Sequence, residues 1–217
     1  MLSRNKKLII FDMDGVLLDS ITIHKKAFAM ALQEYPIGDF DYVKISGMST
    51  EDALTLLLAD HELAVDSDTL VILAQKKRDI AHQLLRQDLR LVDGALNVVQ
   101  HLARQFQLCL ASSASRRNVA LLLQHKNLGN YFGVSISREA VKVAKPDPEI
   151  YCKALSLTGY QAEQAVVIED APMGILAAKN AGIEVIGLMG TCREEELRAC
   201  QPNYLINNLR ELISQLA

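Results

Sequence analysis

The chain has 217 residues, enough to bury one sizeable hydrophobic core and to form a smaller second lobe. Half of the residues are apolar and 23% are charged, a composition that excludes disordered, collagen-like and coiled-coil proteins. The 23 basic and 26 acidic residues give a net charge of −3, which argues against a nucleic-acid-binding protein.

The first predicted element is a buried strand over residues 8–11. From residue 20 to about residue 89 the pattern is typical of helices, because apolar residues recur at helical spacing and residues 49–52 form a good helix start. No convincing strand is predicted in this segment.

After residue 94, helices and strands alternate. The predicted helices cover residues 95–105, 118–125, 148–157, 172–181 and 209–216. The predicted strands cover residues 107–111, 134–137, 165–168, 185–188 and 204–206. This alternation indicates right-handed β-α-β units and a parallel sheet. We therefore predict an α/β protein, with a Rossmann-like parallel-sheet core that has helices on both faces and a small inserted all-α cap domain.

The order of these elements indicates that the cap interrupts the core early in the chain. We place the α/β core at residues 1–19 and 89–217 and the helical cap at residues 20–88. The only apolar run near the start, residues 8–11, is too short for a signal peptide or a membrane span. The four cysteines form no CxxC pair and have no zinc-site spacing. We expect a cytoplasmic protein with free thiols and no membrane partner, and a monomer, because no long apolar surface stripe stands out.

Acidic residues follow two of the predicted strands. Asp12 and Asp14 come directly after the first strand, and Glu169 and Asp170 come after a later one. Each pair has an ordinary alternative, a turn for the first and a helix N-cap for the second. Because parallel strands place their sites at their carboxyl ends, the four acids are also candidates for one shared site.

Two further strand ends offer groups that suit an anion. Ser112 and Ser113 lie at a strand-to-helix junction, where small hydroxyls and backbone N–H groups either bind an anion or cap the helix. Lys145 lies between two strands in a proline-stiffened loop, where a lysine is either exposed or part of the site. If all these groups converge, the crowded carboxylates need a counter-charge, which Mg²⁺ supplies through oxygen ligands. Mg²⁺ and a lysine beside an aspartate favour phosphoryl chemistry.

Four segments, DMDGVLLDS, SSAS, KPDP and VIEDAPMGI, together resemble the haloacid dehalogenase superfamily. The subgroup with a helical cap after the first motif, which includes β-phosphoglucomutase and small-molecule phosphatases, is the most similar. The resemblance implies that Asp12 is the nucleophile, which becomes an aspartyl-phosphate, and that Asp14 is the general acid and base. It implies that Ser112 (or Ser113, one residue on) and Lys145 hold the phosphoryl oxygens.

The resemblance also implies the metal ligands and the cap residues that meet the substrate. Asp12, Asp170 and the backbone carbonyl of Asp14 would hold Mg²⁺, with Glu169 as a ligand or an outer support. His24 and Lys77 lie where the mutases place a cap histidine and a cap lysine. The alternatives are that His24 is a plain histidine of the cap helix and that Lys77 is on a solvent-exposed helix face. The remaining candidates are Arg117 and Asn118, similar to a pair that holds a distal phosphate, and Thr50, where the mutases have an arginine clamp.

The predicted function is that of a Mg²⁺-dependent phosphatase, a phosphoric monoester hydrolase acting on a small phosphorylated metabolite such as a sugar phosphate. Asp14 favours phosphate esters, because family members that cleave carbon–halogen bonds lack this acid. Thr50 counts against the alternative, a phosphosugar mutase similar to β-phosphoglucomutase. A third hypothesis is a non-catalytic protein that binds a phosphorylated metabolite, and binding alone does not require Asp14.

Overall fold

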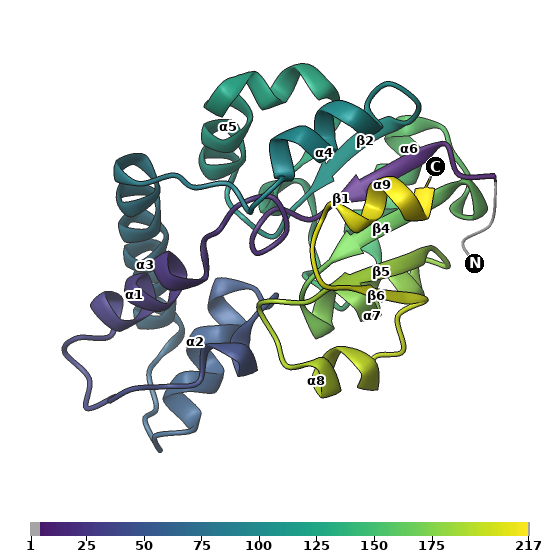
Figure 1. Cartoon of the computed structure of the whole chain (residues 1–217). Coiled ribbons are helices and arrows are strands. Elements are labelled where there is room, and N and C mark those ends of the chain that lie inside the picture. Colours follow the sequence, from purple (N-terminus) through teal and green to yellow (C-terminus); the bar gives the residue numbers. More distant parts are fainter. Residues whose placement is uncertain (1–4, 217) are drawn as a thin grey trace.

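The computed structural model describes residues 5–216 and has one six-stranded parallel sheet at its centre (Figure 1). The strands lie side by side in the order β3-β2-β1-β4-β5-β6. In chain order they are β1 (Leu8–Phe11), β2 (Gln107–Ala111), β3 (Phe132–Ile136), β4 (Ala165–Glu169), β5 (Glu184–Leu188) and β6 (Tyr204–Ile206). The first strand is thus near the middle of the sheet, between the strands that carry two of the other motifs.

Helices cover both faces of the sheet, because alternate residues of each strand point to opposite sides. Ile9 and Phe11 of β1 share a buried cluster with α4 (Ala95–Leu102), α5 (Arg116–Gln124) and α9 (Glu211–Leu216). Leu8 and Ile10 share another with α6 (Glu149–Thr158), α7 (Pro172–Asn180) and α8 (Glu194–Ala199). Short 3-10 turns complete the connections: η2 (His125–Tyr131), η3 (Arg138–Ala140) and η4 (Ala162–Gln164). The predicted fold class is therefore confirmed.

The register of the sheet brings the carboxyl ends of the central strands to one level. Phe11 lies opposite Leu110 of β2 and Ile168 of β4. The backbone N–H of Asp12 continues the ladder by donating to the carbonyl of Ile168 at 3.0 Å. Residues that follow these strands therefore meet at one edge of the sheet.

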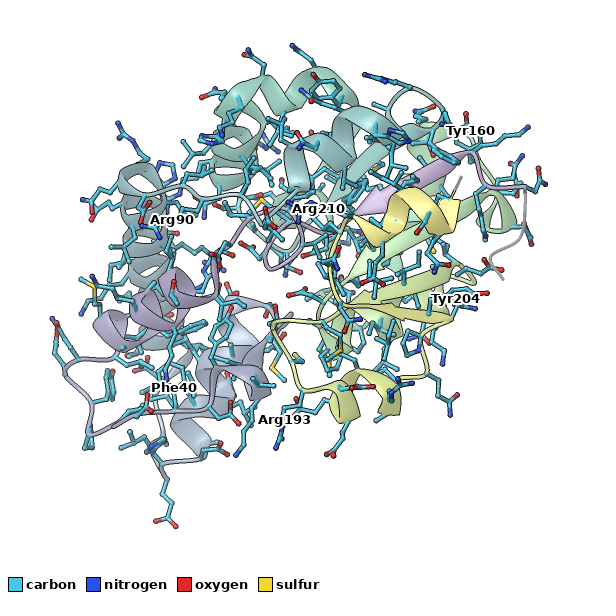
Figure 2. All side chains as sticks on the ribbon, viewed as in Figure 1. Phe40, Arg90, Tyr160, Arg193, Tyr204 and Arg210 are labelled. Atoms are coloured by element: carbon cyan, nitrogen blue, oxygen red, sulfur yellow. The ribbon has the colours of Figure 1, made fainter. Side chains whose placement is uncertain are left out.

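The segment between β1 and β2 contains α1 (Ile21–Ala31), η1 (Tyr42–Ile45), α2 (Thr50–Ala59) and α3 (Ser67–Gln87). These elements pack around an apolar cluster of their own, which includes Phe28, Leu54 and Leu73. Phe40 lies in the helical segment (Figure 2) and belongs to this cluster, where it contacts Phe28 edge to face. A separate core indicates that the segment packs as a unit beside the sheet.

The structure differs from the predicted elements in several places. The helix predicted at 95–105 ends at Leu102, and the strand predicted at 134–137 runs from Phe132 to Ile136. The helix α8 was not predicted, because it is short and charged and buries only Leu197. A long connection, residues 32–49, with only the short turn η1, interrupts the segment that was expected to be almost entirely helical.

Several features predicted from the sequence stay predictions. The division of the core from the cap at residues 19/20 and 88/89 is one of them, and residues 1–4 and 217 lie outside the described part. The cytoplasmic location and the monomeric state also remain predictions. Among the described helices, none has the length and the apolar character needed to cross a bilayer.

Candidate active site

A buried lysine joins two carboxylates at the carboxyl edge of the sheet. Lys145 Nζ lies 2.6 Å from Asp12 Oδ1 and 2.6 Å from Glu169 Oε1. All three side chains are buried, with at most 7% of any residue exposed. The two carboxylates raise the pKa of Lys145 well above its ordinary value, although burial opposes this rise. The lysine is therefore charged, and it offsets part of the negative charge of the site.

Glu169 is held by donors on both of its carboxylate oxygens. Tyr151, which is fully buried on α6, donates its hydroxyl to Oε1 at 2.7 Å, beside Lys145. The backbone N–H of Asp170 donates to Oε2 at 3.1 Å. A β-carbon at Gly174 would overlap the Glu169 carboxylate, so this position requires glycine. Glu169 therefore has a fixed orientation.

Three carboxylates lie close enough to share a metal ion. One oxygen from each of Asp12, Glu169 and Asp170 falls within 4.8 Å of the others. Burial, with the neighbouring negative charges, raises the pKa of Asp12 to about 7 and raises the pKa of Asp170 well above its ordinary value. Such crowding of buried oxygen ligands fits a hard divalent cation such as Mg²⁺, which would lower the cost of keeping the acids ionised.

Two further residues shape this carboxylate cluster. Gly15 has a positive φ of 78°, and a β-carbon there would overlap the Asp170 carboxylate. Thr191, which follows β5, donates its hydroxyl to Asp170 Oδ2. The side chain of Asp14, in contrast, is absent from the three-carboxylate cluster, which is compatible with the prediction that only its backbone carbonyl serves a metal.

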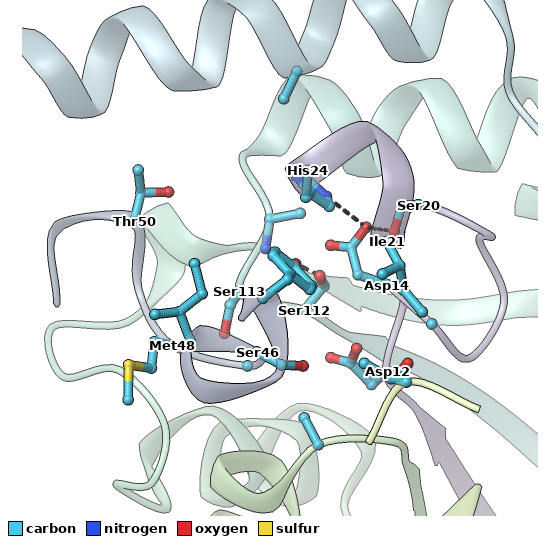
Figure 3. A pocket seen from close by; sticks show the side chains of 18 of the residues that line it. Asp12, Asp14, Ser20, Ile21, His24, Ser46, Met48, Thr50, Ser112 and Ser113 are labelled. Atoms are coloured by element: carbon cyan, nitrogen blue, oxygen red, sulfur yellow. Dashed lines mark hydrogen bonds and ion pairs between the residues drawn. The ribbon is translucent and has the colours of Figure 1, made fainter. Parts of the chain in front are cut away.

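The Asp14 side chain is turned toward the helical segment instead (Figure 3). Ser20 Oγ donates to Asp14 Oδ1 at 2.6 Å, and His24 Nε2 lies 3.0 Å from the same oxygen. Lys77 Nζ, on α3, lies 3.2 Å from His24 Nδ1. An ammonium can only donate, so Nδ1 accepts from Lys77 and Nε2 carries the proton that His24 donates to Asp14.

The electrostatics of this group favour an ionised Asp14. Burial alone would raise the pKa of Asp14, but the contacts with His24 and Ser20 and the charge of Lys77 together outweigh burial and lower it. Burial lowers the pKa of Lys77 to about 8, although Asp14 opposes this shift. Lys77 is only 7% exposed, so the interpretation of Lys77 as an exposed helix-face residue was wrong.

The remaining predicted residues fall into two groups. Ser112, Ser113, Thr50 and Asn118 line the same cavity as the acids and Lys145. Ser112 is buried, and its Oγ accepts from the backbone N–H of Ala114 at 3.0 Å. Arg117 is not among the cavity-lining residues, because its guanidinium pairs with Asp79 of α3 at 2.5 Å.

The structure also reveals residues that the sequence did not single out. Tyr151 and Thr191 hold the carboxylates, and His82 contacts Asn118. Arg78 of α3 lines the cavity and forms an ion pair with Glu51, the neighbour of Thr50. No local signal marks them: Tyr151 has the spacing of an ordinary core residue, and the others depend on contacts between distant segments.

The fold and the site define a class of protein. The family model described as haloacid dehalogenase-like hydrolase matches residues 9–188, which is most of the chain. The chain therefore belongs to the haloacid dehalogenase-like hydrolase family, as the four motifs predicted.

Curated relatives and solved structures agree with this assignment. The chain is 30% identical over 217 residues to a phosphorylated carbohydrates phosphatase of Thermotoga maritima, covering 94% of this chain and 99% of that protein. It is 30% identical over 209 residues to a validoxylamine A 7'-phosphate phosphatase of Streptomyces hygroscopicus subsp. limoneus, with 95% of each chain covered. The crystal structure of a hydrolase from Pseudomonas syringae has the same fold, with a TM-score of 0.87, 24% identity and coverage of 97% and 98%.

Proposed function

We propose that the protein is a Mg²⁺-dependent phosphatase that hydrolyses a phosphomonoester of a small metabolite, with sugar phosphates as the leading substrate class. The contact of Lys145 with Asp12, at the centre of the carboxylate cluster, carries this proposal. The predicted enzyme class, a phosphoric monoester hydrolase, is confirmed by the family and by the phosphatase relatives. The phosphorylated carbohydrates named for one relative support the substrate class.

In the first half of the proposed reaction, a carboxylate oxygen of Asp12 attacks the phosphorus atom. The bond from phosphorus to the ester oxygen breaks, and its electron pair stays on the leaving oxygen, which takes a proton from Asp14. Lys145 lowers the pKa of Asp12 against the effect of burial and offsets the repulsion between a carboxylate and a phosphate dianion. Because Asp14 is ionised in the free protein, the arriving dianion must raise its pKa enough for it to carry a proton.

In the second half, water hydrolyses the aspartyl-phosphate on Asp12. Asp14, now ionised, accepts a proton from the attacking water, and the bond between phosphorus and the Asp12 oxygen breaks to release inorganic phosphate. His24 and Ser20 hold Asp14 in place for both proton transfers through their contacts with Oδ1. Ser112, Ser113 and Lys145 are the residues that we assign to the phosphoryl oxygens.

The Mg²⁺ site is assigned to Asp12, Asp170 and the backbone carbonyl of Asp14, with Glu169 in support. When bound, the ion would neutralise negative charge on the transferring phosphoryl group. Glu169 suits an outer support, because Lys145, Tyr151 and a backbone N–H already occupy its two oxygens. Asp12 and Asp170 each have only one carboxylate oxygen in a side-chain contact, Oδ1 with Lys145 and Oδ2 with Thr191, so within the described residues each keeps its other oxygen for the ion.

The direct test is phosphate release from a panel of phosphorylated metabolites, with and without Mg²⁺. The wild-type protein should release phosphate from at least one sugar phosphate only when Mg²⁺ is present. Asp12→Asn should abolish release, because the amide is no nucleophile, while an exposed matched change, Asp68→Asn, should not. Release that persists in Asp12→Asn, or no release from any panel member, would refute the proposal.

A phosphosugar mutase is the second candidate, and the chain Asp14–His24–Lys77 is the observation that favours it, since the mutases place a histidine and a lysine at these positions. Thr50 opposes it, because threonine cannot form a bidentate phosphate clamp. Analysing the same reaction mixtures for phosphate moved between two hydroxyls of one sugar separates the candidates. A mutase would give the isomeric sugar phosphate faster than free phosphate.

A further inference from the structure

Two polar contacts tie α3 of the helical segment to α5 of the sheet layer. His82 Nδ1 lies 2.7 Å from Asn118 Oδ1, and one turn earlier on α3 Asp79 pairs with Arg117 at 2.5 Å. The two residues of α5 are consecutive, and the two residues of α3 are three apart, so both contacts lie along one seam. Helix α3 therefore contacts α5 beside the cavity, and its Lys77, like Asn118, is a lining residue.

The contact with His82 determines how the Asn118 amide is oriented. The amide oxygen can only accept, so His82 donates through Nδ1–H. With Oδ1 turned to His82, the two N–H donors of Nδ2 are left for another partner, and within the described residues no protein acceptor for Nδ2 is recorded. Asn118 is 4% exposed and lines the cavity, so its Nδ2 is available to a molecule bound there.

We infer that His82 is a positioning residue that holds Asn118, so that Asn118 Nδ2 donates to an oxygen of the substrate beyond its phosphoryl group. The inference rests on the proposed phosphatase function. The acceptor is a hydroxyl, carbonyl or anionic oxygen, which a phosphorylated sugar or polyol carries and a simple hydrocarbon ester lacks. The pair His82–Asn118 thereby selects substrates by their leaving group, and this selection needs the contact between α3 and α5.

A set of His82 variants tests the positioning role. His82→Leu removes the donor, and His82→Asn restores it, because the Asn amide nitrogen stands at the same side-chain depth as Nδ1. We expect kcat/KM for the best sugar phosphate to fall about tenfold in His82→Leu, as for the loss of one hydrogen bond, and to stay within about twofold of wild type in His82→Asn. With phenyl phosphate, which has no oxygen beyond the phosphoryl group, the loss in His82→Leu should be clearly smaller.

Two controls separate positioning from a general structural effect. His101→Leu, on α4 and outside the cavity, should leave kcat/KM unchanged for both substrates. Asn118→Ala should lose about as much as His82→Leu, and the double variant should lose no more than Asn118→Ala, because both changes remove the same contact. If the two residues instead affected the structure independently, the losses in kcat/KM of the two single variants would multiply in the double variant.

The outcomes distinguish this inference from the proposed function. If the wild-type protein hydrolyses no member of the panel, the proposed function fails and the inference falls with it. If the wild-type protein is active, the inference alone is overturned by any of three results: equal losses on sugar phosphates and phenyl phosphate, no rescue in His82→Asn, or multiplying losses in the double variant.

Discussion

Lys145 Nζ lies 2.6 Å from Asp12 Oδ1, although the two residues are 133 positions apart in the chain. The contact forms because β1 and β4 are neighbours in the sheet, and Lys145 precedes the helix that leads to β4. Lys145 is also 2.6 Å from Glu169 Oε1, so one buried cation compensates two buried anions. This arrangement makes the site sensitive to charge, and four predictions follow from it and from the neighbouring contacts.

Removing the buried cation should destabilise the protein. Lys145→Met keeps the aliphatic length but leaves Asp12 and Glu169 without their partner, and breaking a buried ion pair in this way costs about 3–5 kcal/mol. Urea unfolding of the metal-free protein at neutral pH measures the change in the free energy of unfolding. The exposed Lys142→Met should change it by less than about 0.5 kcal/mol. Equal stability of Lys145→Met and wild type would contradict this account.

The free energy of unfolding of the metal-free protein should fall as pH rises from about 4 to about 7. Burial raises the pKa of Asp12 from its ordinary value of 3.8 to about 7, so in this window the folded state holds a proton that the unfolded state has lost. Stability therefore decreases with pH. The pKa of Asp14 is lowered, so its contribution changes below pH 4, outside the window. The measurement is urea unfolding at several pH values.

Asp12→Asn is the control for this pH dependence, because it removes one of the two carboxyl groups whose pKa is raised, leaves the other, Asp170, and keeps the side-chain shape. The free energy of unfolding of the wild type minus that of Asp12→Asn should fall as pH rises from about 4 to about 7. A constant difference would show that Asp12 titrates at its ordinary pKa in the folded protein.

Mg²⁺ should stabilise the folded protein. The three-carboxylate cluster exists only in the folded chain, and a ligand present at 100 times its Kd adds about 2.7 kcal/mol, or roughly 5 °C or more in Tm for a chain of this size. Thermal unfolding with increasing Mg²⁺ measures the shift. In Asp170→Asn the shift should be largely lost, whereas Asp68→Asn, which is exposed on α3, should retain it. A full shift in Asp170→Asn would place the ion elsewhere.

His24 should set the acidic limb of the pH–rate profile. The contact with His24 lowers the pKa of Asp14 against the effect of burial, so in His24→Ala that pKa should rise. The pH at which activity is lost on acidification should then move upward, because Asp14 must be ionised to accept a proton from water. Rates between pH 4 and 8 measure this limb. His61→Ala, at the end of α2 and away from Asp14, should leave it in place.

Much of the fold could be predicted from local patterns. Strand 8–11 and residues 165–168 of the next central strand are uniformly apolar because both faces of the sheet are covered, and this pattern is visible in the sequence alone. Helix α8 could not be predicted, because its charged surface and single buried leucine give no periodic signal. The helical character of the segment between β1 and β2 could be expected from its pattern, but the path of the chain between these helices could not.

The sequence by itself determined the parallel α/β fold and the residue types at the strand ends, because three of the four motifs contain or directly follow a strongly apolar strand. Only the tertiary structure decided which side chains meet. It turned Asp14 toward His24 and Lys77, paired Arg117 with Asp79 away from the cavity, and brought Tyr151 and His82 into supporting positions. These contacts join segments that are far apart in the chain, and their geometry depends on the packing of the helical segment against the sheet, which no local pattern encodes.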